Sequence, residues 1–140
     1  MKSKKINGGY IIKLEKGEEI ITALTKFCED NNIKSGAIAG IGGTNDVSLK
    51  YYDLQKGEYI SQKFGGKNYE IISLNGNVSL VDDKPFTHIH TVLGDSDYRT
   101  FGGHLESAVI AITGEITITM IDDVVTRKFN DEFKLNFLDL

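Results

Sequence analysis

The chain has 140 residues, of which 40% are hydrophobic and 26% are charged, and this size and composition predict one globular domain over residues 1–140. Its formal net charge of -4 and pI near 5.3 argue against a surface that binds nucleic acid by charge alone, because such a surface needs clustered lysine and arginine. No apolar run approaches the roughly 20 residues that cross a bilayer, and no apolar leader follows the basic start, so we expect a cytoplasmic protein without a membrane partner.

The first expected elements are a basic end and a strand. Lys2, Lys4 and Lys5 form the one basic cluster of the chain. At an N-terminus a solvated, frayed end is the expected structure, and a nucleic-acid-binding arm is the alternative. The apolar run over residues 10–14 predicts a strand, which a turn at residues 16–17 ends.

One segment, residues 18–31, shows the spacing of an amphipathic helix. Its apolar residues recur three and four positions apart and are Ile20, Ile21, Leu24, Phe27 and Cys28. Glu18 and Glu19 are expected in the first turn, where the helix macrodipole favours acidic side chains. Cys28 is the only cysteine, so it cannot form an internal disulfide, and we expect its thiol to be buried.

The remaining sequence is a succession of short runs with strand composition, separated by turn signals. The runs are AIAGI, VSLKYYD, EYISQKF, YEIISLNGNVSLV, HIHTVLG, HLESAVIAITGEITITMI, VTRKFN and the tail DEFKLNFLDL, and the expected turns are GG, QKG, GGK, NGN, DDKP and TGE. Alternation is clearest over residues 115–120, where apolar side chains would face one way and polar ones the other. The predicted fold class is α+β, a mostly antiparallel sheet with one main helix, and its uncovered face favours a homo-oligomer.

Two further segments are interpreted as packing elements. Residues 36–43, GAIAGIGG, are rich in glycine but lack the lysine and the strand, loop and helix order of a P-loop. Close backbone packing, at a subunit interface if the chain assembles, is the better interpretation. Tyr51 and Tyr52 are adjacent in an expected strand, so one should pack in the core while the other reaches the site or an interface.

All three histidines of the chain, His88, His90 and His104, lie in the one stretch FTHIHTVLGDSDYRTFGGHLESA. In a strand, His88 and His90 project from the same face about 7 Å apart, and the turn-rich GDSDYRTFGG suits a hairpin that sets His104 opposite them. Gly102 and Gly103 would allow close backbone approach or a positive φ. Three neutral imidazoles with an open fourth position suit zinc, with iron, nickel or copper as alternatives. The competing interpretation is two solvated histidines and a third that is hydrogen-bonded in a turn.

A catalytic site would also need a carboxylate within hydrogen-bond reach as general base. Glu70, Glu106 and Asp95 are the candidates, and Glu106 shares the face of His104 if the strand is unbroken. A solvated carboxylate, or a hydrogen-bond partner that orients a histidine, is the alternative role for each. Arg99, at the expected hairpin tip, is a candidate contact for an anionic ligand, with solvation as its alternative.

Four segments resemble the prokaryotic PPC domain, also called the DUF296 family, and they occur in that family's order. They are GIGGTNDVSLKYYDLQKGEY at 40–59, YEIISLNGNVSL at 69–80, PFTHIHTVLGDSD at 85–97 and FGGHLESAVI at 101–110. The resemblance implies an α+β domain with a mostly antiparallel sheet and one main helix that assembles as a homotrimer. It also implies that His88, His90 and His104 are metal ligands, because the prokaryotic members that keep these histidines resemble metal-containing proteins.

The resemblance also carries two functional analogies. Plant relatives combine the domain with an AT-hook that binds AT-rich DNA, but this chain lacks the Arg-Gly-Arg-Pro core, since its single proline, Pro85, stands between Lys84 and Phe86. The HxH and GGH blocks are similar to the zinc site of acetolactate decarboxylase. Only the histidines match that enzyme, so decarboxylation is an analogy about the site.

Two hypotheses follow from these observations. The first is a trimeric protein that binds a divalent metal, with zinc the expected ion, and that binds a small molecule or catalyses a metal-dependent reaction there. The second is a DNA-binding or protein-interaction module. The intact histidines and the absence of a basic surface favour the first, and the sequence leaves the reaction open.

Overall fold

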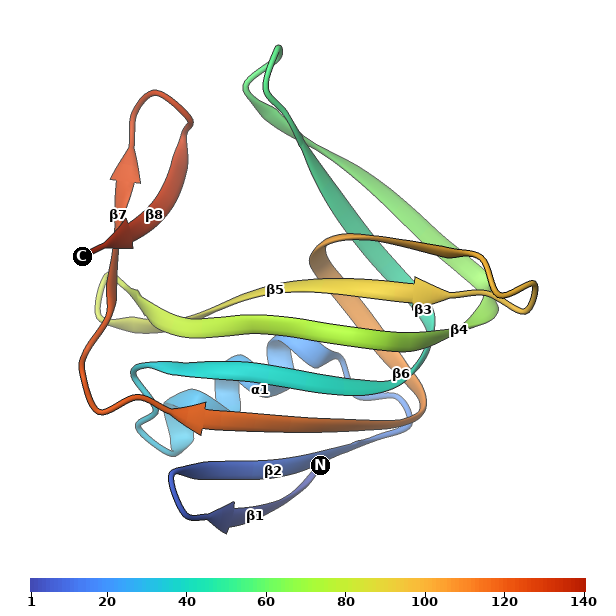
Figure 1. Cartoon of the computed structure of the whole chain (residues 1–140), viewed down its shortest axis with the longest axis horizontal. Coiled ribbons are helices and arrows are strands. Elements are labelled where there is room, and N and C mark those ends of the chain that lie inside the picture. Colours follow the sequence, from blue (N-terminus) through green and yellow to red (C-terminus); the bar gives the residue numbers. More distant parts are fainter.

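The computed structural model describes all residues, 1–140, as one eight-stranded sheet with a single helix (Figure 1). The elements are β1 Lys2–Ile6, β2 Gly9–Glu15, α1 Ile20–Asp30, β3 Gly36–Asp53, β4 Glu58–Val81, β5 Lys84–Gly94, β6 Thr100–Met120, β7 Thr126–Asn130 and β8 Leu135–Asp139. The strand order is β1-β2-β6-β3-β4-β7-β8, and β5 pairs with β4 and β6. All pairs are antiparallel except one parallel bridge between β4 and β7, so the predicted α+β fold with a mostly antiparallel sheet is confirmed.

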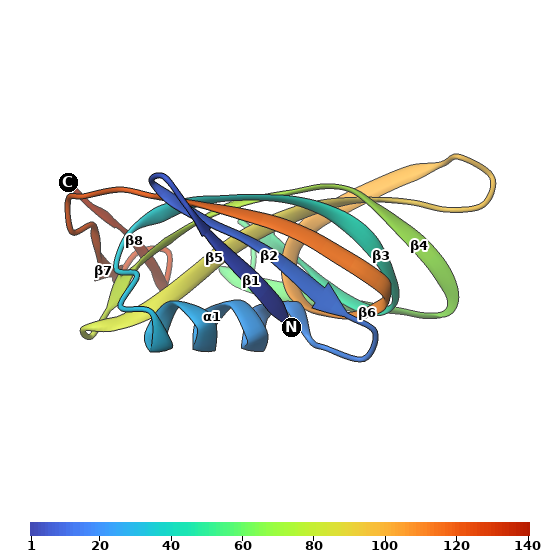
Figure 2. The same cartoon turned by 90° about the horizontal axis from the view of Figure 1, so that it is seen from below.

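Helix α1 covers one face of the sheet, as the view from below shows (Figure 2). Glu19 caps it, because its carboxylate accepts hydrogen bonds from the N–H groups of Ile21 at 3.0 Å and Thr22 at 2.7 Å. The same carboxylate accepts the N–H of Ala108 in β6 at 3.0 Å, which ties the helix to the sheet. The prediction that Glu18 and Glu19 lie inside the first turn was wrong, since both precede it. With 11 residues, α1 is too short to cross a membrane, and no other helix exists to do so.

The hydrophobic core lies between α1 and the sheet face that the helix covers. Alternation along the strands supplies it, since Ile12 of β2, Ile89 of β5 and the predicted pair Ile116 and Ile118 of β6 are all buried. The expectation for Cys28 is also confirmed, because its thiol is buried and this burial raises its pKa to about 12. The thiol is therefore part of the packing and stays protonated near neutral pH.

The strands are longer than the sequence indicates, because several expected turns are continuous strand. GG and TGE lie inside β3 and β6, and GGK and NGN lie inside β4. At Gly76 a Cβ atom would stand 2.0 Å from the carbonyl oxygen of His88, so close approach of β5 requires the glycine. Register shifts near Gly42 and Thr44 let β3 bend without ending. The expected turns QKG and DDKP are confirmed at residues 54–57 and 82–83.

The N-terminal lysines are ordered, and the predicted frayed end was wrong. β1 pairs with β2 over its whole length, with Lys2 opposite Lys13. The terminal ammonium group of Met1 lies 2.6 Å from a carboxylate oxygen of Glu18. Backbone pairing thus orders a segment whose side chains remain exposed, and side-chain composition alone does not predict it.

Two hairpins extend from the sheet beside each other (Figure 1). One is the distal part of β3 and β4, and the other is formed by β7 and β8, which we call the C-terminal hairpin. The predicted ordered final strand is therefore confirmed. The hydroxyl of Tyr52 joins the hairpins by donating to the carbonyl of Phe133 at 2.6 Å, while Tyr51 is 72% exposed. Tyr52 is thus half-buried between the hairpins, and the prediction that one of the two tyrosines packs in the core was wrong.

Candidate metal centre

The three histidines lie on the sheet face opposite α1, which we call the helix-free face. Residues paired directly across neighbouring strands project to the same side, and His90 pairs with both His104 of β6 and Asn75 of β4. Asn75 in turn pairs with the exposed Ala39, while Ile89, next to His90, is buried against the helix side. The prediction that a hairpin sets His104 opposite the HxH strand is confirmed.

The histidine cluster, His88, His90 and His104, is tight enough to share one ion. The ring centroids are 5.1 Å apart for His88 and His104 and 5.3 Å apart for the other two pairs. One ring nitrogen of each histidine lies within 4.8 Å of the others. Close backbone approach permits this, because a Cβ atom at Gly102 would stand 2.3 Å from a carbonyl oxygen of β5, and one at Gly103 3.0 Å from one of β3.

Burial favours the neutral form of two of these imidazoles, His88 and His104, and the neutral form is the one that binds a metal. Desolvation, helped by the positive charge of Arg127, lowers the pKa of His88 to about 4. Desolvation, helped by the other two histidines, lowers the pKa of His104 to about 4. Nδ1 of His104 is buried without a hydrogen-bond partner, so a ring nitrogen is unsatisfied by the protein. Three neutral nitrogen donors fit zinc, and iron, nickel or copper would accept the same set.

Arg127 of β7 is the main site residue that sequence analysis missed. Its Nη2 lies 3.2 Å from Nδ1 of His88, and because a guanidinium group only donates, the histidine nitrogen is the acceptor. Arg127 also donates to Oγ of Ser79 at 2.8 Å, to Oδ1 of Asn77 at 2.9 Å and to the carbonyl of Asn136 at 2.9 Å. Nothing in the local sequence marks this residue, because its partners come from β4, β5 and β8.

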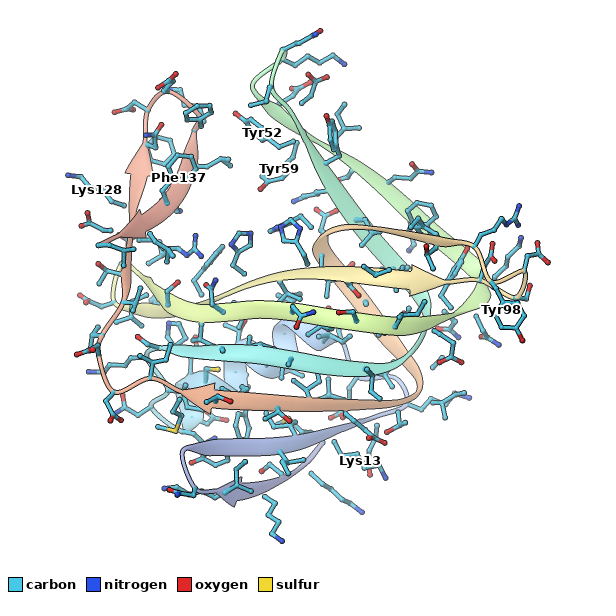
Figure 3. The ribbon with its side chains drawn as sticks, in the orientation of Figure 1. Lys13, Tyr52, Tyr59, Tyr98, Lys128 and Phe137 are labelled. Atoms are coloured by element: carbon cyan, nitrogen blue, oxygen red, sulfur yellow. The ribbon has the colours of Figure 1, made fainter.

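A pocket of about 220 Å³ opens between the histidine cluster and the C-terminal hairpin. Its lining residues are Tyr59, Phe86, His88, His104, Arg127, Lys134, Leu135, Asn136 and Phe137. The ring of Tyr59 lies 5.3 Å from that of His104, and the ring of Phe86 lies 6.4 Å from that of His88. Figure 3 shows Tyr59 and Phe137 projecting towards each other from the two hairpins. Aromatic rings therefore border the cluster on the side from which a small molecule can enter.

Among the predicted carboxylates, only Glu106 lies beside the cluster. One of its oxygens is 2.7 Å from Nζ of Lys50, and the other accepts a hydrogen bond from Ser61 at 3.0 Å. These bonds, with that of Lys50 the strongest, lower the pKa of the carboxyl group. A carboxylate with both oxygens engaged and a lowered pKa is a weak base, so Glu106 neutralises Lys50, the residue that pairs with His104 across β3 and β6.

The structure does not bring Glu70 and Asp95 to the cluster, which consists of the histidines alone. Glu70 lines a separate pocket of about 420 Å³ on the helix-free face. Asp95 accepts the backbone N–H of Arg99 at 3.0 Å, and this bond is the main cause that lowers its pKa. The guanidinium group of Arg99 lies 3.1 Å from Asp95 and 2.7 Å from Asp97, so the charge predicted to meet an anionic ligand is neutralised within its own turn.

The helix-free face also exposes isoleucines from four strands. Their exposed fractions are 49% for Ile11, 55% for Ile41, 50% for Ile72 and 72% for Ile112. Two adjoining surface pockets share Ile41 and Ile72, so these side chains form one continuous apolar surface. Extended exposed apolar patches of this kind are typical of interaction surfaces.

Several known proteins are similar to this chain. The family model of the Plants and Prokaryotes Conserved (PCC) domain matches residues 1–122. A candidate DNA-binding protein from Bacteroides thetaiotaomicron is 33% identical, with a TM-score of 0.95 over 99% of this chain and 96% of that one. A plant- and prokaryote-conserved (PPC) protein from Pyrococcus horikoshii is 31% identical, with a TM-score of 0.86 over 99% and 94%. A metal-containing protein from Archaeoglobus fulgidus is 31% identical, with a TM-score of 0.84 over 97% and 94%.

Two more distant likenesses cover only part of the other protein. Bifunctional protein GlmU from Synechococcus sp. (strain JA-3-3Ab) is 27% identical over 111 residues, which are 78% of this chain, while the chain spans 16% of that protein. Acetolactate decarboxylase from Bacillus subtilis is 15% identical, with a TM-score of 0.55 over 88% of this chain and 57% of that one, so the two share a fold. The predicted resemblance to the PPC domain is confirmed, and so is a weaker similarity to acetolactate decarboxylase at the level of the fold, whereas the similarity of the zinc site stays a prediction.

Proposed function

This chain belongs to the Plants and Prokaryotes Conserved domain family, and from that premise we propose that it is a metal-binding protein whose histidine cluster holds one divalent ion, with zinc the expected ion. The observation that carries the proposal is the convergence of three imidazole nitrogens within 4.8 Å on one face of the sheet. The likeness to a metal-containing protein, 31% identical over 97% of this chain, supports it.

His88, His90 and His104 would hold the ion, and the lowered pKa of His88 and His104 keeps those rings unprotonated near neutral pH. Zinc bound by three histidines supplies a Lewis acid and, at its fourth position, a water of lowered pKa. The pocket of about 220 Å³ beside His88 and His104 favours a site that admits a small molecule over a purely structural ion. Glu106 has both oxygens engaged by Lys50 and Ser61, so it is poorly suited to act as the general base.

Elemental analysis tests the metal site directly. Protein purified without a metal-affinity tag is expected to contain about one zinc ion per chain, and His88→Ala and His104→Ala are expected to lose it. Thr119→Ala, at the far end of β6, is the matched control and should keep the metal. Wild-type protein that is metal-free and takes up no added zinc would contradict the proposal, as would full metal content in both histidine variants.

We further infer that copies of this chain assemble as a homotrimer through the helix-free face. The family resemblance indicates a trimer, and the continuous isoleucine surface provides apolar area that assembly would remove from water. Light scattering coupled to gel filtration should give a mass about three times the 15.5 kDa of the chain. A mass of one chain over the whole concentration range would contradict the assembly.

DNA binding is a second candidate function, favoured because the 33% identical protein from Bacteroides thetaiotaomicron is described as a candidate DNA-binding protein. The net charge of -4 opposes it, and the exposed lysines of β1 are the basic cluster available to contact phosphates. A gel shift comparing wild type with the triple variant Lys2→Ala, Lys4→Ala, Lys5→Ala tests it, because substitution preserves the ordered strand. Binding that depends weakly on salt and is unchanged in the triple variant would exclude this route to DNA.

A further inference from the structure

The pocket beside the histidine cluster contains a positive charge that the protein does not neutralise. Arg127 is half-buried, and no carboxylate lies within ion-pair distance of its guanidinium group. The other arginine, Arg99, shows the contrast, since Asp95 and Asp97 both contact it. The lysines near the pocket are also paired, Lys50 with Glu106 and Lys134 with Asp131 at 3.7 Å. Arg127 is therefore the one cation of the pocket without an anion.

The guanidinium group is held rigidly and keeps donors for a ligand. Its hydrogen bonds to Ser79, Asn77 and Asn136 use three of the five N–H groups that an arginine side chain carries. The fourth contact, to Nδ1 of His88, uses the one unprotonated nitrogen of that neutral ring, so it is released when His88 binds an ion. All four acceptors are neutral, so these bonds orient the group without compensating its charge. A side chain fixed in this way loses little entropy when it binds a ligand.

We propose that this pocket binds a small organic carboxylate, whose charged group contacts Arg127 and whose apolar body lies against the aromatic rings. The inference rests on the proposed metal site, because imidazole ligands carry no negative charge and so leave the charge of a divalent ion bound at the histidine cluster uncompensated as well. An anion between Arg127 and the cluster would compensate both charges. The guanidinium group also lies 5.4 Å from the ring of Phe86, which shows that charge and aromatic surface are adjacent.

The size and walls of the pocket define the ligand further. A volume of about 220 Å³ equals that of roughly seven water molecules at about 30 Å³ each, which suits a small metabolite. Phe86, Tyr59 and Phe137 offer ring faces, with Tyr59 and Phe137 projecting into the space from opposite hairpins (Figure 3). A planar or branched apolar body fits such walls better than a polyhydroxylated one does.

Benzoate is a suitable probe, because it joins a carboxylate to a planar apolar body, and benzamide is its neutral isostere. Titration calorimetry on the full-length, zinc-loaded chain should show that benzoate binds the wild type at least tenfold more tightly than benzamide does. Arg127→Gln should weaken benzoate binding roughly tenfold or more, and Arg127→Lys should fall between it and the wild type. Arg99→Gln is the matched control and should bind as the wild type does.

Several outcomes would overturn the inference. Equal benzoate affinity in Arg127→Gln, benzamide binding as tight as benzoate, or inorganic phosphate binding more tightly than benzoate would each contradict a carboxylate pocket at Arg127. If Arg127→Gln fails to fold, Arg127→Lys takes its place, and benzoate affinity equal to that of the wild type in this variant would contradict the inference. The zinc content of every sample separates the two proposals: a metal-free wild type contradicts the proposed function, whereas a zinc-loaded wild type that ignores benzoate contradicts only the carboxylate pocket.

Discussion

The two faces of the sheet are made by the same strands, yet they differ in packing. One face is covered by the helix and packed with apolar side chains, while the other carries polar groups without partners in the chain. On the helix side, β5 contributes Ile89 and Leu93, both fully buried. On the helix-free face the same strand contributes His88 and His90, at the positions between the buried ones. The helix side therefore determines stability, while the other side is free to carry function.

The helix-free face carries several groups that a ligand or a second subunit could satisfy. It has a buried histidine nitrogen without a hydrogen bond, an arginine without a carboxylate and isoleucines that are about half exposed or more. Such features cost free energy in an isolated chain unless a ligand or a second subunit satisfies them. The comparison predicts that, of two neighbouring residues on one strand, a substitution on the helix side lowers stability and a substitution on the helix-free face weakens ligand binding.

The largest expected effect on the free energy of unfolding is the difference between substitutions at Ile89 and at His90. Ile89→Ala should lower the free energy of unfolding by about 2–5 kcal/mol, because it opens a cavity under α1. His90→Ala should change the stability of the metal-free protein by less than about 1 kcal/mol and abolish zinc binding. Urea unfolding in the presence of a chelator measures both, and equal losses in the two variants would contradict the division between faces.

Most of the helix side could be predicted from sequence because it follows local periodicity. The spacing of Leu24 and Phe27 gives the helix, and the alternation around Ile116 and Ile118 gives the strand that packs beneath it. The prediction that the glycines of GG, GGK, NGN and TGE form turns was wrong, since Gly76 is required by the close approach of β5, the strand that pairs with it. A single sequence cannot distinguish a glycine that permits close approach of a paired strand from a glycine that forms a turn.

The helix-free face could be predicted only in part, for the same physical reason. The two histidines of HxH and the hairpin that returns His104 are local, and that geometry is confirmed. Arg127 could not be found, because the C-terminal hairpin reaches His88 through pairing of β7 with β4, which no local pattern encodes. The only feature of the sequence that distinguishes it is that the chain has just two arginines.

The cap of α1 should give the next largest effect. Glu19→Ala removes the acceptor for Ile21, Thr22 and Ala108, so the loss should be about 1–2 kcal/mol and should be accompanied by fraying of the helix. Glu29→Ala, an exposed carboxylate near the other end of α1, is the control and should stay within about 0.5 kcal/mol of wild type. Hydrogen exchange of the first helical turn checks the location, and protection equal to wild type would remove the capping role.

A smaller effect is the pH dependence of the metal-free protein. The pKa of His88 and His104 is lowered from 6.5 to about 4, so between these values the unfolded chain binds protons that the folded chain does not. Stability should therefore fall as pH drops from about 6.5 to 4, and the partial exposure of both rings keeps the loss modest. Unfolding at pH 7 and pH 5 should show a smaller difference in the double variant His88→Asn, His104→Asn. An undiminished difference would assign the dependence to other groups.

The smallest effect on the stability of one chain should come from Ile112→Ser, because this side chain is 72% exposed. Within one chain the change should stay within about 0.5 kcal/mol, since there is little packing to lose. In the proposed homotrimer the same change places a hydroxyl in the apolar surface shared by four strands, so light scattering at low concentration should show dissociation that wild type does not. Val124→Ser, 55% exposed but outside that surface, should assemble normally. If both variants assemble equally well, the exposed isoleucines do not form the interface, and the helix-free face differs from the helix side in its histidines and arginine alone.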